Sequence, residues 1–455
     1  MNNINPKAIS KQFTTDILVI GAGSAGCLAA LSAAEGKYKV TIAERYGFPG
    51  GTSTQMLDTF YGFFTPGEAP KKVVGGLPDQ VVNALDKTGD IFLRPNTYGA
   101  GTGVNYNPER LKLIWDRLLL ENGVQTFYHS LLVEVVPSDD RIDCIFYHKG
   151  TGFFKITARR VIDASGDADY CHLAGLTYEK AGENESAQSM TTTFRMANVD
   201  LEKYRQAGGK KMLKEKMVYA VDSGKHPLPR KTGSAHEMCM PGCISTVAVK
   251  VVDLDSLDNE DITAAEQEGR RQAFIYEDFF RAEVPGYENS KIIGLSHQIG
   301  VRETRRVYGN YRLTKDDCIE AKMPQDRILL CGAPIEDHRK GPSGESETYW
   351  NYVKGEGVYG VPYGTIVPKD ATNCWVVGRC FSATHDAHAS CRSMAQTMSM
   401  GQAAGQAVLL SLENDWSASE VPVEVLQDRL LEIDGLLETP NEMADVSRNG
   451  WRKNF

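Results

Sequence analysis

The stretch Asp16-Ile-Leu-Val-Ile-Gly-Ala-Gly-Ser-Ala-Gly-Cys27 decides the fold of this chain. Its apolar first half predicts a buried β-strand, and the small residues after it predict a helix that begins at the glycines. A second apolar run (Val40–Ile42) and an acid complete the pattern, with Glu44 standing 23 residues after Gly21. A strand, a glycine-rich turn, a helix, a strand and an acid in this order form the βαβ fingerprint of dinucleotide-binding proteins.

Each glycine of this turn has a physical role. Gly21 permits the tight turn, Gly23 lets the backbone approach a pyrophosphate, and Gly26 lets the helix pack close to the sheet. The helix N-terminus offers free N–H groups and the positive end of its dipole to the phosphates. Glu44 can accept hydrogen bonds from ribose hydroxyls and would repel a phosphate on that ribose, which favours FAD or NAD over NADP.

The overall composition is that of an ordinary globular enzyme. A length of 455 residues predicts two or three lobes, and a net charge of −9 argues against a nucleic-acid partner. No apolar run is long enough to span a bilayer and the first twelve residues lack a signal-peptide core, so we expect a cytoplasmic protein without a membrane partner. The ten cysteines are scattered without a CxxC pair, which predicts no metal site.

Changes in residue pattern along the chain predict its domains. Helical periodicity is expected at Pro108–Leu120, Asp261–Phe280 and Ser393–Leu412. Short β-rich runs between 130 and 158 predict a meander that returns to the main sheet. The predicted division is 1–172 for the first part of the nucleotide-binding domain, with a helical insertion at 55–123 and the β-meander at 130–158; 173–355 for a substrate domain; 356–415 for the return to the nucleotide-binding domain; and 416–455 for a helical tail.

Four separated motifs carry a resemblance to a known family. They are Gly21–Glu44, Pro49-Gly-Gly-Thr52, Val161-Ile-Asp-Ala-Ser-Gly-Asp-Ala-Asp169, and Val377-Gly-Arg-Cys380 together with Met400-Gly-Gln-Ala-Ala-Gly405. With them the chain resembles the FAD-dependent oxidoreductase family of flavoproteins with two dinucleotide-binding domains. The resemblance implies an α/β fold: a Rossmann-like FAD-binding domain of glutathione-reductase-like topology, with an inserted α+β substrate domain.

The resemblance also implies which residues hold FAD. Val133 matches the strand position whose backbone reads adenine, and the helix after Arg392 matches the one whose N-terminus faces the flavin pyrimidine. Many relatives have Gly-Asp where this chain has Gly378-Arg379, so Arg379 is expected to contact phosphate rather than the ribityl chain. The residues expected to bind FAD are Gly21, Gly23, Ser24, Ala25, Gly26, Glu44, Arg45, Gly50, Gly51, Thr52, Val133, Ala164, Ser165, Gly166, Asp167, Gly378, Arg379, Ser393 and Met394.

The loop before the last long helix contains the first candidates for catalysis. His385 and His388 lie in Ala383–Arg392, and either imidazole is a candidate general base while hydride leaves carbon. Arg392 can hold a carboxylate or an oxyanion bidentately. Two alternatives stay open for the histidines: a structural role, or covalent attachment of one of them to the flavin.

Arg302, in Gly300-Val-Arg-Glu-Thr-Arg-Arg306, is the fourth catalytic candidate. The alternative is a buried network in which Glu303 pairs with Arg302 or Arg305 and shapes the junction between domains. A motif of this kind also resembles the FAD-dependent subgroup.

These observations predict an enzyme that transfers hydride between a small organic substrate and flavin N5, with dioxygen or another acceptor taking the electrons. The sequence has no second GxGxxG motif, and Cys27 has no CxxxxC partner, which disfavours pyridine-nucleotide disulfide reductase chemistry. Two rivals stay open: an FAD-assisted isomerisation or elimination, and a flavoprotein subunit of an electron-transfer complex. The substrate, the acceptor and any homo-oligomer are also left open.

Overall fold

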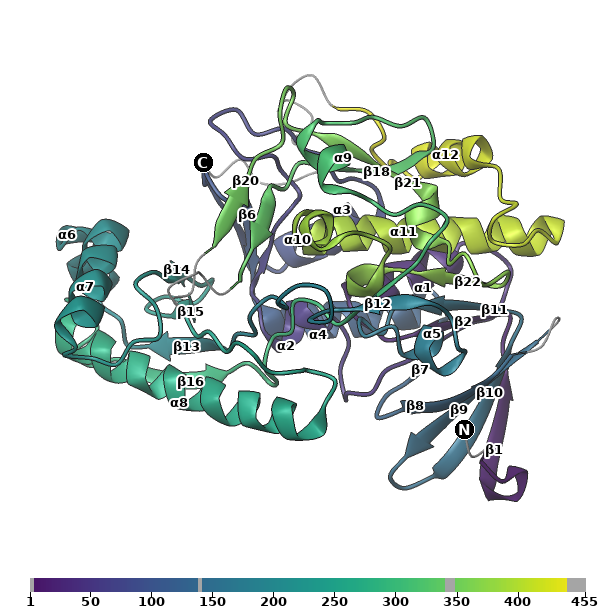
Figure 1. Cartoon of the computed structure of the whole chain (residues 1–455), viewed down its shortest axis with the longest axis horizontal. Coiled ribbons are helices and arrows are strands. Elements are labelled where there is room, and N and C mark those ends of the chain that lie inside the picture. Colours follow the sequence, from purple (N-terminus) through teal and green to yellow (C-terminus); the bar gives the residue numbers. More distant parts are fainter. Residues whose placement is uncertain (1–3, 138–140, 340–347, 440–455) are drawn as a thin grey trace.

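The structure is a computed structural model that describes residues 4–137, 141–339 and 348–439. A five-stranded parallel sheet, in the order β22-β11-β2-β3-β7, forms its centre (Figure 1). The predicted βαβ unit is confirmed, because its two strands pair in parallel on either side of the helix α1. The bounds are β2 Ile17–Ile20, α1 Ser24–Ala33, β3 Val40–Ala43, β7 Gln125–Phe127, β11 Arg160–Asp163 and β22 Cys374–Val376.

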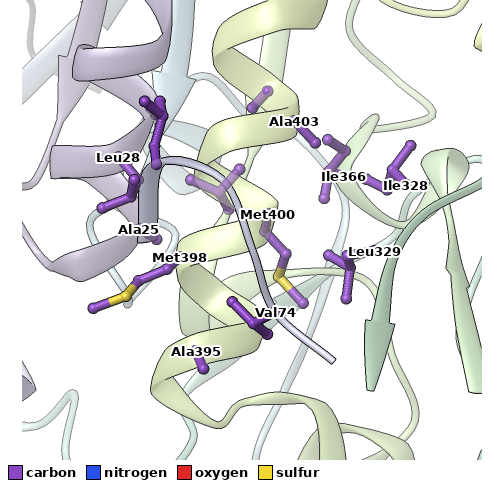
Figure 2. Close-up of a cluster of buried hydrophobic side chains, with 14 of the residues drawn as sticks. Ala25, Leu28, Val74, Ile328, Leu329, Ile366, Ala395, Met398, Met400 and Ala403 are labelled. Carbon is purple, nitrogen blue, oxygen red and sulfur yellow. The ribbon is translucent and has the colours of Figure 1, made fainter. Parts of the chain in front are cut away.

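Two helices cover one face of this sheet. The 21-residue helix α11 (Met394–Asn414) packs directly on α1, because added Cβ atoms at Gly401 and Gly405 would lie 2.1 Å and 2.4 Å from atoms of α1. Figure 2 shows α11 between Ala25 and Leu28 of α1 on one side and β18 on the other. The small residues of both helices permit this close crossing, which holds two segments distant in sequence against one sheet.

A four-stranded sheet covers the other face of the central sheet. It has the order β1-β10-β9-β8, and only the β1–β10 pair is parallel. Leu18, Ile20 and Val161 of the central sheet share a buried cluster with Phe146 and Ile156 of this meander. The predicted meander is therefore present as a third layer. Its bounds are β1 Ile9–Thr14, β8 Leu131–Val136, β9 Ile142–His148 and β10 Gly152–Ala158.

The insertion at 55–123 is less helical than its sequence predicts. Alongside α3 (Leu77–Asp86) and α4 (Pro108–Glu121) it contains a three-stranded sheet in the order β4-β6-β5. The strands are too short for their period to be recognised in the sequence, and antiparallel pairing across the glycine-rich turn stabilises them. The remaining bounds here are α2 Thr52–Gln55, β4 Thr59–Phe60, β5 Ile91–Arg94 and β6 Gly103–Tyr106.

The middle of the chain forms an α+β unit to one side of the central sheet (Figure 1). Its hydrophobic core draws on residues between 190 and 299, whereas residues from Leu313 onward belong to the core of the central domain. The predicted long helix is present as α8. The bounds are β13 Thr193–Ala197, α6 Leu201–Gln206, α7 Gly209–Ser223, β14 Ser234–Glu237, β15 Ile244–Val247, α8 Asn259–Glu283 and β16 Lys291–Leu295.

Short elements connect these layers. Three two-stranded sheets pair β12 with β17, β18 with β21 and β19 with β20. Of the predicted helical tail, α12 is present, and residues 440–455 lie outside the described part. The bounds are α5 Asp169–Leu173, β12 Tyr178–Lys180, β17 Arg305–Val307, α9 Lys315–Ile319, β18 Arg327–Cys331, β19 Ile335–Asp337, β20 Tyr349–Asn351, β21 Tyr359–Pro362, α10 His385–Cys391 and α12 Val423–Glu432.

The predicted fold class is confirmed: a Rossmann-like α/β domain carries an α+β unit between its two sequence segments. Within the described residues, no helix is both long enough and apolar enough to cross a bilayer.

Candidate active site and cofactor cleft

One large cavity, of about 1010 Å³, runs from the carboxyl ends of the central strands to the middle unit. Its first wall is the glycine-rich turn before α1, and its second is the start of α11. This is the crevice in which open α/β sheets bind their ligands. Fifteen of the nineteen residues predicted to bind FAD line it: Gly21, Gly23, Ser24, Ala25, Glu44, Arg45, Gly51, Thr52, Ala164, Ser165, Gly166, Gly378, Arg379, Ser393 and Met394.

The surroundings of the three glycines of the turn differ. Gly21 has a φ of 94°, and an added Cβ would lie 2.5 Å from the carbonyl oxygen of Ala164. An added Cβ on Gly26 would lie 1.9 Å from the carbonyl oxygen of Gly21. At Gly23, by contrast, no atom lies within 4 Å of an added Cβ, so this glycine faces open space in the cavity.

Glu44 lies at the end of β3 with only 6% of its surface exposed. Its carboxylate accepts hydrogen bonds from the backbone N–H groups of Ala22, at 2.7 Å, and Tyr46, at 2.9 Å. Burial raises its pKa, and these two bonds oppose the shift. The backbone therefore fixes an acid at the cavity wall, as a ribose-reading residue requires.

Four predicted FAD residues do not line the cavity. Gly26 leaves room for the backbone of Gly21, and Gly50, with a φ of 104°, leaves room for the side chains of Ser53 and Thr54. Val133 lies where the β8–β9 register shifts between Leu132 and Glu134, away from the cavity wall. Asp167 lies behind the wall, where it pairs with two arginines. For these four residues, direct contact with the cofactor stays a prediction.

Asp167 orients two cations toward the cleft. Its carboxylate lies 2.8 Å from Arg379 Nη2 and 3.2 Å from Arg45 Nη1. Burial raises the pKa of this carboxyl, but Arg379 and Arg45 bring it below its ordinary value. Arg379 Nη1 is buried without a hydrogen-bond partner, so it has a donor left for a ligand. This chain has Gly378-Arg379 where many relatives have Gly-Asp, and the Arg379 guanidinium, held by Asp167, lies in the cavity wall.

Four polar side chains gather at the cavity wall near the start of α11: Arg302, Glu336, His338 and Arg392, here called the inner polar cluster. His338 Nε2 lies 3.0 Å from Glu336 Oε1, and its Nδ1 lies 3.1 Å from the Thr348 hydroxyl. Arg302 Nη1 donates to the Ser189 carbonyl, and Arg392 Nη2 donates to Gln188 Oε1 at 2.9 Å. Three sequence-distant segments therefore meet here.

Charges within the inner polar cluster shift one another's pKa values. Burial and the neighbouring Arg392 lower the pKa of Arg302 to about 9. Burial raises the pKa of Glu336, but His338 and Arg392 outweigh it and bring the value to about 2. Burial and Arg302 lower the pKa of His338 to about 4. At neutral pH the cluster thus holds two cations, one carboxylate and one neutral imidazole.

His385 and His388 do not line the cavity, so neither imidazole is positioned to take a proton from a substrate there. His385 is buried between Glu303, with its Nδ1 at 3.1 Å, and Asp337, with its Nε2 at 3.2 Å. Burial alone would lower its pKa, but bonds to Asp337 and Glu303 raise it to about 10. His388 is fully buried; its Nε2 lies 2.7 Å from the Arg379 carbonyl oxygen, and burial lowers its pKa to about 3. Both placements are those of structural residues.

Glu303 forms a buried ionic network, but its partner is neither Arg302 nor Arg305, the two arginines that the sequence offered. It pairs with Arg306, whose other Nη lies 2.9 Å from Glu179. Arg302, the neighbour of Glu303 in sequence, instead reaches the cavity. The catalytic candidates therefore divide: Arg302 and Arg392 are at the site, and the two histidines are behind it.

Comparison with known proteins identifies the family. The sequence matches the family described as FAD dependent oxidoreductase over residues 16–430. The chain belongs to this family. No curated protein sequence matches this FAD-dependent oxidoreductase.

Several solved structures are similar to this FAD-dependent oxidoreductase. A geranylgeranyl bacteriochlorophyll reductase-like protein from Thermoplasma acidophilum is 13% identical, with a TM-score of 0.46 over 93% of this chain and 85% of that chain. The p-nitrophenol 4-monooxygenase PnpA from Pseudomonas putida DLL-E4 is 11% identical, with a TM-score of 0.47 over 96% and 92%. A flavoprotein/dehydrogenase from Cytophaga hutchinsonii is 13% identical, with a TM-score of 0.42 over 92% and 84%.

The cleft of this FAD-dependent oxidoreductase fits its cofactor. Gly23 leaves open space where the pyrophosphate approaches the backbone, and Arg379 Nη1 is a buried donor without a partner. Ser393 and Met394 place the N-terminus of α11 at the wall, where a helix dipole favours negative charge. These residues would hold FAD along the crevice.

Sequence reasoning missed Glu336 and His338. No motif surrounds them, and their only signal is a dense polar run, Glu336-Asp-His-Arg339, after the apolar strand β18. Their placement depends on β19, which packs beside α10. A short strand of this kind reaches the cavity only through tertiary packing.

Proposed function

We propose that this protein transfers a hydride between a small organic substrate that carries a carboxylate and FAD N5, with dioxygen or another acceptor taking the electrons. The inner polar cluster, at the α11 end of the cleft, is the observation that carries the proposal. FAD, when bound, supplies the two-electron redox chemistry. The protein's part is to hold the substrate and to accept its proton.

Arg302 and Arg392 hold the carboxylate. Both guanidiniums line the cavity, and Arg392 Nε is buried without a hydrogen-bond partner. Glu336 balances only one of the two charges, so an anionic ligand completes the balance of the cluster. A planar guanidinium binds a carboxylate through two parallel hydrogen bonds, which also fixes the orientation of the substrate.

We assign proton acceptance to His338 in place of His385 and His388. Glu336 is ionised and lies 3.0 Å from Nε2, so Nε2 carries the hydrogen and Nδ1 keeps its lone pair. Thr348 is the present partner of Nδ1, and a substrate hydroxyl can take the same position. A carboxylate on the far nitrogen stabilises the imidazolium that forms when Nδ1 accepts the proton.

Anaerobic mixing tests the reaction class. If a substrate is oxidised, the visible absorbance of the oxidised flavin bleaches and stays bleached until an acceptor is added. A turnover that leaves the flavin oxidised would instead support the FAD-assisted isomerase or lyase. Activity that appears only with a second chain would support the electron-transfer subunit.

Replacing Arg392 with glutamine is expected to lower kcat/KM for flavin reduction by about 10- to 100-fold, because one charge-assisted contact to the carboxylate is lost. The measurement is stopped-flow bleaching, with the FAD content determined for each protein. Arg392→Lys keeps the buried charge and separates loss of orientation from loss of folding. Arg270→Gln on the exposed face of α8 is the control. An unchanged rate for the glutamine variant would remove Arg392 from the site.

The pKa of His338 predicts the acid limb of the pH profile. The base must be neutral, and its pKa is about 4 in the free protein. Arg302, Glu336 and Arg392 are the charged groups that face it. We expect kcat/KM to be level above about pH 5 and to fall as the pH drops through about 4. His338→Gln should remove this acid limb and most of the activity. If the acid limb persists in the variant, a group other than His338 causes it.

A cytoplasmic setting remains part of the proposal. All ten cysteines are free, and nine of them are buried. Free thiols are the rule where glutathione keeps proteins reduced.

A further inference from the structure

The charged residues that line the cavity are strongly unbalanced. Nine arginines and lysines face it, against two carboxylates, Glu44 and Glu336. The whole chain has the opposite sign, with a net charge of −9. The lining of the cleft is therefore positively charged although the whole chain is negatively charged. This favours anionic ligands in the cleft.

Part of this positive charge is already assigned. Arg45 and Arg379 share Asp167 and lie beside the phosphate-binding turn. Arg302 and Arg392 belong to the inner polar cluster. Five further cations line the cavity: Arg94, Lys210, Lys214, Arg230 and Lys231. Arg94, Lys210 and Lys214 are here called the outer cation group. Among the described residues, none of these three forms a salt bridge.

Arg94 has only neutral partners. It ends β5, and its Nε donates to Asn105 Oδ1 at 3.2 Å. Its Nη2 donates to the Tyr61 hydroxyl, and its guanidinium carbon lies 5.6 Å from the centre of that ring. These contacts fix the orientation of the guanidinium but leave its charge uncompensated.

The lysines reach the cavity from another domain. Lys210 and Lys214 lie four residues apart on α7, so they share one face of the helix. Lys210 is exposed at the rim of the cavity. Desolvation and the proximity of Arg94 lower its pKa, and the carboxylate of Glu237, which pairs with Arg205, opposes the shift. Two chain segments that are distant in sequence thus place like charges close to each other at this wall. Like charges repel, so the arrangement is most stable with an anion between them.

Tyr61 links the two groups of cations. Its hydroxyl accepts from Arg94, and its ring lines the same cavity as the inner polar cluster. Burial raises the pKa of Tyr61, Arg94 opposes that, and the carboxylate of Glu336 adds to the increase. Tyr61, Arg94 and Glu336 all line this one cavity, so one ligand in it has access to both groups of cations.

We propose that the outer cation group binds a second anionic group of the substrate, so that the substrate is a small organic dianion held at both ends. This inference rests on the proposed function, in which the first carboxylate lies at Arg302 and Arg392. The second group is a carboxylate or a phosphate, since both accept from arginine and lysine.

Binding to the FAD-loaded protein tests the inference without turnover. Linear dicarboxylates of increasing length are titrated, each beside its monomethyl ester, and the flavin spectrum and the heat of binding are recorded. At one optimal length the dicarboxylate is expected to bind at least about 10-fold more tightly than its ester, because a second charge-assisted contact forms. Phosphoglycolate and longer phosphorylated acids form the second arm, and tighter binding by them would identify the second group as phosphate.

Lys210→Gln is expected to reduce the preference for the dianion by about 10-fold and to leave ester binding unchanged. Lys211→Gln is the matched control, since Lys211 is the next residue on the same helix, is exposed and does not line the cavity. Arg94→Gln should act like Lys210→Gln.

The outcomes separate this inference from the proposed function. If esters bind and every dianion binds no better, or if the Lys210 and Lys211 variants weaken the dianion equally, the second site is wrong and the first stands. If no carboxylate binds the FAD-loaded protein at all, the proposed function itself is wrong.

Discussion

Replacing Gly23 with valine is expected to abolish FAD binding while the protein still folds. Gly23 has a φ of −65° and a ψ of 174°, which valine adopts freely, and no atom lies within 4 Å of an added Cβ. The new side chain would therefore project into the cleft and hold the pyrophosphate away from the N–H groups of α1. Loss of two such bonds predicts an increase in the Kd for FAD of more than about 100-fold.

The measurement is FAD content after purification and the Kd from flavin fluorescence quenching. The Tm of the FAD-free variant should match that of FAD-free wild type, which shows that only the ligand site changed. Gly294→Ala is the control, because Gly294 also has no atom within 4 Å of an added Cβ and lies in β16, outside the cavity. A Gly23→Val protein that purifies with one FAD per chain would contradict the assignment of the cleft.

Replacing Glu303 with glutamine is expected to lower the free energy of unfolding by about 3 kcal/mol, because two buried cations each lose one of their carboxylate partners. Glu303 is 3% exposed and contacts both His385 and Arg306. Denaturant unfolding of the FAD-free protein gives the value. The exposed pair of Arg271 and Glu268 on α8 provides the control: Arg271→Gln should change stability by less than about 1 kcal/mol. A Glu303→Gln protein as stable as wild type would show that the network contributes nothing.

The same network predicts how stability depends on pH. The pKa of His385 rises from 6.5 to about 10 on folding, so its contribution is complete below about pH 6.5 and is lost as the pH rises toward 10. The pKa of Glu303 falls from 4.5 to about 2, so its contribution is complete above about pH 4.5 and is lost as the pH falls toward 2. His385→Gln should flatten the alkaline decrease. If the loss of stability at alkaline pH is as large in the variant as in the wild type, groups other than His385 cause it.

The cofactor half of the site was predictable from sequence. Gly21, Gly23 and Glu44 are local features, because a strand, a turn and a helix that follow one another in sequence bring them together. Gly51 and Arg379 required the family resemblance, since they come from separate motifs. The position of Asp167 behind the wall was not predictable, because a motif does not reveal which side chains face the cavity and which support it.

The catalytic half of the site was much less predictable from the sequence. His385 and His388 do not line the cavity. His385 is buried between two carboxylates, and the imidazole of His388 lies against the Arg379 carbonyl oxygen. Glu336 and His338 belong to no motif; Glu336 reaches the cavity from β19 and His338 from the position directly after that strand. Lys210 reaches the same cavity from α7. The spacing of residues within a motif determines neither the protonation state of a side chain nor whether that side chain is buried.

By itself, the amino-acid sequence determined the nucleotide fold, the preference for FAD or NAD and the path of the phosphate-binding turn. These follow from backbone constraints within one βαβ unit: a glycine that needs a positive φ, a missing side chain at a close approach, and an acid at a set distance along the chain. Tertiary structure alone decided which ionisable groups face the substrate. That choice depends on packing between segments hundreds of residues apart, which sets both the burial and the charge neighbours of each group.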